Sequence, residues 1–153
     1  MKAMKETDKI RCAEWLLALF QVRGEAGPII HRVSQAEDGS EEEKFATFLE
    51  ALEKLPPILE RLKVAPQLEG INMKKLRGIQ ELEVKAVEDY ITSCELSIEQ
   101  LKSPNSLRYS AIVLKLSLAS KYWEMSAKEA VAFLRKLRFS PEESNAFLRK
   151  LGF

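Results

Sequence analysis

The stretch LRYSAIVLKLSLASKYW, residues 107–123, is apolar on nearly every side of the helix that it predicts. Only arginine, lysine and serine interrupt its apolar and aromatic residues. A helix that is apolar all round is typically buried inside a protein. The stretch therefore predicts an all-α fold in which the other helices pack around a central apolar helix over 107–123.

The composition of the whole chain agrees with an all-α fold in one domain, residues 1–153. Apolar residues make up 46% of the chain and charged residues 31%, and Gly and Pro occur only six times each. Leu, Glu, Lys and Ala, which favour helices, dominate. A chain of 153 residues can bury a core of its own. It contains no apolar run of 18 residues, so we expect no membrane-spanning segment.

Segments before this stretch predict further helices, for a total of about five to seven. Asp8 can cap a helix over 9–23, because its carboxylate can accept hydrogen bonds from the amides of the first turn. Asn72 can cap a longer helix over 73–102 in the same way. The sequence thus places several amphipathic helices around the central one.

Breaks between these helices are predicted where glycine and proline gather. Residues 24–40 contain three glycines and one proline and predict a long loop. Ser40 and Glu43 form a capping box that starts the next helix. The pair Pro56-Pro57 is expected to end or kink that helix.

The chain ends with a tandem repeat of 14 residues, 126–139 and 140–153, in which nine positions are identical. Each copy begins with serine and has glutamate three residues later, which is a capping box. The repeat therefore predicts a short helical hairpin. Gly152 is expected to adopt the left-handed conformation that ends many helices.

Charge divides the chain into an acidic part and a basic part. Residues 1–102 carry 15 basic and 19 acidic side chains, whereas residues 103–153 carry nine basic and four acidic ones. Nucleic-acid binding would use this basic end, provided that its cations face one side together. The candidate phosphate contacts are Lys121, Arg135, Lys136, Arg138, Arg149 and Lys150.

The sequence offers few groups for catalysis or for binding a metal. His31 is the single histidine, and Cys12 and Cys94 lack the spacing of a zinc or redox site. We therefore expect no enzyme activity, no metal and no cofactor. An enzyme would instead require a pocket that holds His31 among acidic neighbours. Both cysteines lie in helical patterns and are expected to be buried free thiols in a cytoplasmic protein.

These observations favour a non-catalytic helical protein, a small subunit or adaptor that binds another protein or itself. Its predicted protein interface is the cluster Tyr122, Trp123 and Met125, because such residues are enriched at interfaces. The alternative is a nucleic-acid-binding subunit that uses the basic end. In size and class the chain is similar to the small all-helical subunits of nucleoprotein assemblies such as CRISPR effector complexes.

Overall fold

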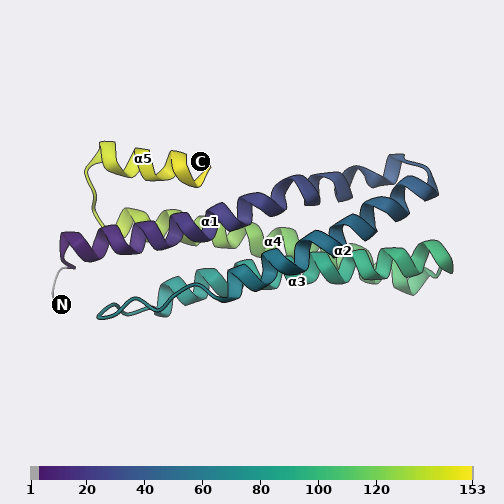
Figure 1. Ribbon diagram of the computed structural model, residues 1–153, viewed down its shortest axis with the longest axis horizontal. Helices are drawn as coiled ribbons and strands as arrows, with labels where there is room; N and C mark the ends of the chain where they lie inside the picture. The colour runs from purple at the N-terminus through teal and green to yellow at the C-terminus, as the bar shows by residue number, and fades with distance from the viewer. Residues whose placement is uncertain (1–3, 153) are drawn as a thin grey trace.

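The computed structural model describes residues 4–152, and all the regular secondary structure in this range is helical (Figure 1). The all-α prediction is therefore confirmed. None of the described helices is long and apolar enough to cross a bilayer. A 3₁₀ turn over Ala36–Asp38 connects the first two helices. The helices are α1 (Glu6–Gln35), α2 (Glu41–Lys63), α3 (Lys74–Lys102), α4 (Ser106–Lys136) and α5 (Pro141–Leu151).

The four long helices form an elongated bundle of two hairpins, α1 with α2 and α3 with α4 (Figure 1). Close backbone contacts join α1 to α2, α2 to α3 and, most extensively, α3 to α4. The pair α1 and α4, which would close the ring, has hardly any such contact. The short helix α5 packs against α1 and, less closely, α4. One side of α4 therefore has no long helix close to its backbone, although the Arg23 side chain of α1 reaches Trp123 of α4.

The hydrophobic core takes most of its side chains from α1, α2 and the first two thirds of α3. From α4 it takes Ala130, Leu134 and Leu137, which all lie near the end of that helix or just beyond it. Within residues 107–123 only Ile112 and Ala119 are buried. The prediction of a central helix over 107–123 is therefore wrong. This segment is peripheral because most of its large apolar side chains are exposed or only half-buried, and α4 has its closest backbone contacts with α3.

Small residues explain why α3 and α4 approach each other so closely. Ala86 and Ser93 of α3 are buried, as are Ala119, Ser126 and Ala130 of α4. Side chains of this size let two helix backbones come close without leaving voids between them. The small residues thus hold α3 and α4 together closely, while several bulky apolar residues near the start of α4 remain exposed.

The predicted loop over 24–40 is mostly helix, so this prediction is wrong. Helix α1 continues through Gly24, Gly27 and Pro28 to Gln35. Glycine and proline disfavour a helix interior, but here the second half of the helix buries an apolar face. Ala26, Ile29 and Val33 belong to the hydrophobic core. Tertiary packing therefore outweighs the local preference of the sequence.

Helix α2 begins where the sequence predicts but does not end at Pro56-Pro57. The Ser40 side chain accepts a hydrogen bond from the Glu43 amide at 3.2 Å, which confirms the predicted cap. Both prolines lie inside the helix, which runs on to Lys63. Leu55, Ile58, Leu59 and Leu62 around them are all buried. Burial of this face again outweighs the local effect of proline.

The tandem repeat forms one separate helix rather than a hairpin of two short helices. Its first copy, 126–139, continues α4, and only the second copy folds as α5. Ser140 accepts from the Glu143 amide at 3.2 Å, so the second capping box is confirmed. The turn between the copies contains Arg138 at φ 57°, and Gly152 ends α5 at φ 96°. Phe153 lies outside the described residues.

Candidate functional site

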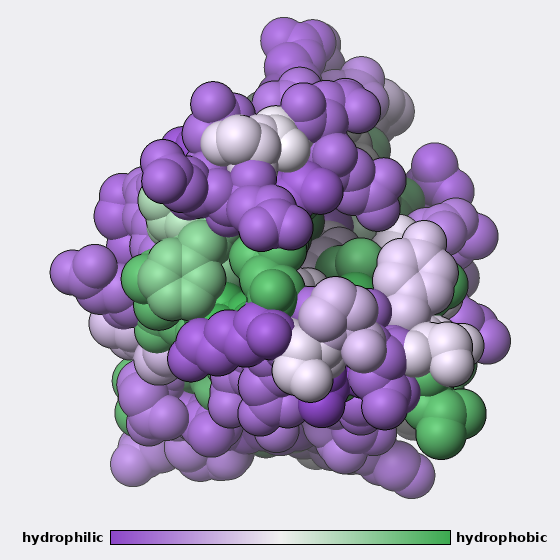
Figure 2. Space-filling model, turned by 90° about the vertical axis from the view of Figure 1, so that its right-hand side faces the viewer, coloured by the Kyte–Doolittle hydropathy of each residue, from purple (hydrophilic) through white to green (hydrophobic). Residues whose placement is uncertain are grey.

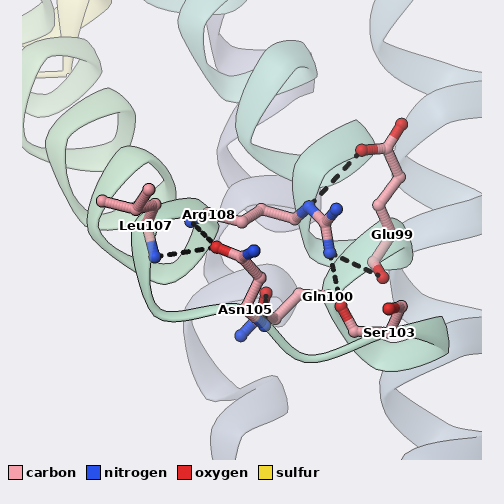
Figure 3. Close-up of polar contacts among 6 residues, drawn as sticks. All are labelled: Glu99, Gln100, Ser103, Asn105, Leu107 and Arg108. Carbon is pink, nitrogen blue, oxygen red and sulfur yellow. Dashed lines mark hydrogen bonds and ion pairs between the residues drawn. The ribbon is translucent and has the colours of Figure 1, made fainter.

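The turn between α3 and α4 fixes where α4 begins (Figure 3). The Asn105 side chain accepts hydrogen bonds from the amides of Leu107 and Arg108, at 2.9 and 3.1 Å. Arg108 donates to the backbone carbonyl groups of Glu99 and Ser103. Its guanidinium group also lies 3.6 Å from the Glu99 carboxylate. The cap and this arginine together hold the start of α4 against the end of α3.

Just beyond this turn, α4 exposes four large side chains within eight residues. They are Leu107, Tyr109, Val113 and Leu114, with 82%, 57%, 46% and 58% of their surfaces exposed. We refer to these four residues as the α4 surface. Figure 2 views the end of the bundle that includes the α3–α4 turn and shows hydrophobic side chains at the surface among polar ones. On a helix of about 3.6 residues per turn, Leu107 and Leu114 lie near one edge of the exposed side of α4, and Tyr109 and Val113 near the other edge. Large apolar side chains that gather on the exposed side of one helix are a candidate interaction site.

The charged residues that α4 itself contributes around the α4 surface are all basic, and two of them are paired with carboxylates of α3. Residues 106–123 include Arg108, Lys115 and Lys121 and contain no acidic residue. Lys115 lies 3.4 Å from Asp89 of α3. The first turn of α4 also contains no acidic residue, so the partial positive charge of the helix N-terminus is not offset there.

The predicted interface cluster is divided between the interior and the surface. Trp123 is half-buried and makes an edge contact with Tyr90, with ring centroids 5.5 Å apart. Tyr122 is half-buried near Lys85 of α3, whose ammonium lies 5.9 Å from its ring centre. Met125 is 37% exposed. The structure thus places Trp123 in internal packing and leaves Met125 at the surface.

A buried polar network joins α1, α3 and α4, and the sequence analysis missed it. Arg23 and Ser126 each donate to the same Glu83 carboxylate oxygen, Oε1, at 2.8 Å. The second oxygen, Oε2, is buried without a hydrogen-bond partner. The Arg23 guanidinium also stacks on the rings of Phe20 and Trp123, at 5.0 and 4.7 Å. A serine that resembles a helix cap in sequence is here an internal donor.

Burial and charge act in opposite directions within this network. Burial raises the pKa of Glu83, whereas the positive charge of Arg23 and the hydrogen bonds from Ser126 and Arg23 lower it. Burial also lowers the pKa of Arg23, against the effect of Glu83. Since the Glu83 side chain is fully buried, the arginine is the group that makes its charge tolerable.

The six basic residues singled out in the sequence are all exposed. Lys136 lies beside Lys75 of α3, whereas Arg135 lines a different hollow together with Glu124 and Lys128. Arg149 and Lys150 lie on α5, which packs mainly on α1. The structure therefore distributes the predicted cations over α4, the turn after it and α5.

The single histidine is exposed on α1, where its carbonyl group accepts a hydrogen bond from Ser34. Within residues 4–152, no group of three or more His, Cys, Asp or Glu side chains is arranged to hold a metal ion. The prediction of buried free thiols is confirmed for Cys12 and Cys94.

Both thiols are expected to resist a thiol reagent while the protein is folded. Burial raises the pKa of Cys94 to about 11 and also raises that of Cys12. The reactive form is the thiolate, which is scarce at neutral pH in both cases. In a reaction with Ellman's reagent at pH 8, we expect no labelling of native protein and two thiols in urea. Rapid labelling of the native protein would contradict this burial.

Comparison with known proteins provides no relative. No protein-family model, no curated protein and no solved structure matches the chain.

Proposed function

We propose that this protein is a non-catalytic interaction protein that binds an acidic amphipathic helix of a partner protein along the α4 surface. The observation that carries the proposal is the exposure of Leu107, Tyr109, Val113 and Leu114 on a helix whose closest backbone contacts are with α3. Amphipathic helices bind such surfaces through apolar side chains spaced three, four and seven residues apart. The partner would cover the side of α4 that the bundle leaves open.

Charge supports an acidic partner rather than a second copy of the chain. The segment 106–123 contains only basic charged residues and lies at the positive end of the α4 dipole. A second α4 would bring like charges together, whereas acidic residues beside the apolar face of a partner helix would complement them. The proposal therefore commits to a heterologous partner.

The test is a selection of helical peptides against the whole protein from a random displayed library. We expect the enriched peptides to be acidic and to carry apolar residues at helical spacing. Their affinity, measured by fluorescence anisotropy, should fall at least about tenfold in the variant Leu107→Gln/Leu114→Gln. Glutamine retains helix propensity and approximate size, so the fold should be unchanged.

The matched control is Val64→Gln, which replaces another apolar residue, 72% exposed, at the end of α2. This variant should bind the selected peptides as the wild type does. Selected peptides that are basic, or that bind the α4 variant with full affinity, would overturn the proposal. A dimer that dissociates on Leu114→Gln would do so as well, because it would identify a second copy as the occupant.

A second candidate function is nucleic-acid binding by the basic end of the chain. The observation that favours it is the exposure of all six candidate cations, although they lie on different helices. If this function holds, single-stranded RNA should bind at about 50 mM salt and weaken steeply by 200 mM. Replacement of Arg135, Lys136, Arg149 and Lys150 by Glu should abolish that binding and preserve the fold. Binding that survives the replacement would exclude this surface.

A further inference from the structure

A hollow of about 480 Å³ lies where the first turn of α3 meets the last turn of α4, far along α4 from the α4 surface. Ile79, Ala132 and Phe133 give it an apolar floor, and Gly78 opens onto it. Three lysines stand around it, Lys74 and Lys75 of α3 and Lys136 of α4, against one carboxylate, Glu129. Its size lies within the range of small-molecule sites.

The lysines of this hollow lie where their positive charges are unfavourable. Lys75 and Lys136 are in contact, and the hydrogen-bonding contact and positive charge of Lys136 lower the pKa of Lys75, while Glu129 acts in the opposite direction. Both lysines of α3 also lie in its first turn, where cations oppose the helix dipole and acidic residues are absent. An anion among the three ammonium groups would relieve both repulsions.

Gly78 is a further feature that packing does not explain. Glycine inside a helix is unfavourable, yet a Cβ atom at this position would meet no other atom within 4 Å. No close approach of a neighbouring element therefore requires glycine here. Its missing side chain leaves the hollow open between the lysines and the ring of Phe133.

We propose that this hollow binds an organic phosphate, with the phosphate group held by Lys74, Lys75 and Lys136 and an apolar or aromatic moiety lying on Ala132 and Phe133. Lysine ammonium groups are common phosphate ligands. The apolar floor favours a phosphate ester over the free ion, because it gains from covering an apolar group. This site is separate from the α4 surface, so the phosphate proposal can be tested independently of the proposed function.

The test is a titration of the full chain with phenyl phosphate, inorganic phosphate and phenol, followed by NMR at the Gly78 amide. We expect saturable binding of phenyl phosphate, at least about tenfold weaker binding of inorganic phosphate, and no binding of phenol. In Lys75→Gln/Lys136→Gln the affinity for phenyl phosphate should fall at least about tenfold. The Leu107→Gln/Leu114→Gln variant should bind phenyl phosphate like the wild type.

Two variants at one position separate occupation of the hollow from damage to the fold. Gly78→Ala and Gly78→Leu should both raise the Tm, because both residues favour the helix. Only the leucine side chain is long enough to fill the hollow, so only Gly78→Leu should lose phenyl phosphate. Equal binding by both variants would overturn the proposal. So would equal affinity for inorganic and phenyl phosphate, or unchanged affinity in the double lysine variant.

The phosphate group bound by these lysines could also belong to a nucleic-acid backbone, so an oligonucleotide is tested as a competitor. A single-stranded oligonucleotide should not displace phenyl phosphate from the Gly78 site at equal phosphate concentration. Displacement by the oligonucleotide that is lost in Lys75→Gln/Lys136→Gln would overturn the assignment to a small organic phosphate. It would assign these lysines to a nucleic-acid backbone instead.

Discussion

Replacement of Arg23 by methionine is expected to lower the free energy of unfolding by about 3–5 kcal/mol. The replacement removes the only charged partner that the structure gives the Glu83 carboxylate within residues 4–152. Glu83 is fully buried and its Oε2 already lacks a hydrogen-bond partner. Without the guanidinium group, the carboxylate must remain as an unpaired buried charge or take up a proton. Urea unfolding at pH 7.5 measures the loss.

The matched control is the double variant Arg23→Met/Glu83→Gln. A neutral amide removes the buried charge and keeps an acceptor for Ser126. We expect the double variant to recover about 2 kcal/mol relative to Arg23→Met, which corresponds to a strong coupling between the two side chains. If Arg23→Met were within about 1 kcal/mol of the wild type, the network would not hold the three helices as described.

The loss caused by Arg23→Met is also expected to depend on pH. Burial raises the pKa of Glu83 in the folded protein above its value in the unfolded chain. The stability that Glu83 contributes is therefore fully present below the unfolded pKa and is lost as the pH rises through the folded pKa. Removal of Arg23 raises the folded pKa further, because its positive charge lowers it in the wild type. The deficit of the variant should therefore be smaller at pH 4.5 than at pH 7.5. Arg23→Met/Glu83→Gln should show no such trend.

Leu62→Ala is expected to destabilise the protein by about 2–5 kcal/mol, whereas Leu114→Ala should change its stability by less than about 0.5 kcal/mol. Leu62 is fully buried in α2, and Leu114 is 58% exposed on α4. The two replacements remove the same atoms, so the difference reports the environment alone. Equilibrium urea unfolding of both variants under one condition gives the comparison.

This pair also distinguishes the observed position of α4 from a central one. A central helix over 107–123 would make Leu114→Ala as costly as Leu62→Ala. A loss above about 2 kcal/mol for Leu114→Ala would therefore contradict the exposed position of this residue. Such a loss would also remove the main support for binding along the α4 surface.

Sequence reasoning predicts the helical class and several helix starts, because caps and apolar spacing are local signals. Ser40, Asn72 and Ser140 all accept hydrogen bonds from amides of the helices that follow. The breaks are harder to predict, since Pro56-Pro57 and the glycines of 24–40 lie in helices stabilised by burial. Whether a local preference prevails depends on contacts between residues that are distant in sequence.

Local sequence signals are also insufficient to predict the candidate site. The apolar character of 107–123 was visible in the sequence, but a buried helix and a binding surface have the same composition. Ser126 likewise matches a capping box, yet its hydroxyl donates to Glu83, 43 positions away. The signal that distinguishes these cases is the number of neighbouring helices, which the sequence pattern does not contain.

Photo-crosslinking is the most direct test of the claim that the α4 surface binds an acidic helix. A benzophenone amino acid is placed at position 114 or, as the control, at position 64, and each protein is irradiated with a selected acidic peptide. Both positions are exposed and apolar; position 114 lies on α4, and position 64 is the residue that follows the end of α2. The account predicts a crosslink from position 114 and none from position 64. A crosslink from position 64 alone, with full peptide affinity, would contradict it.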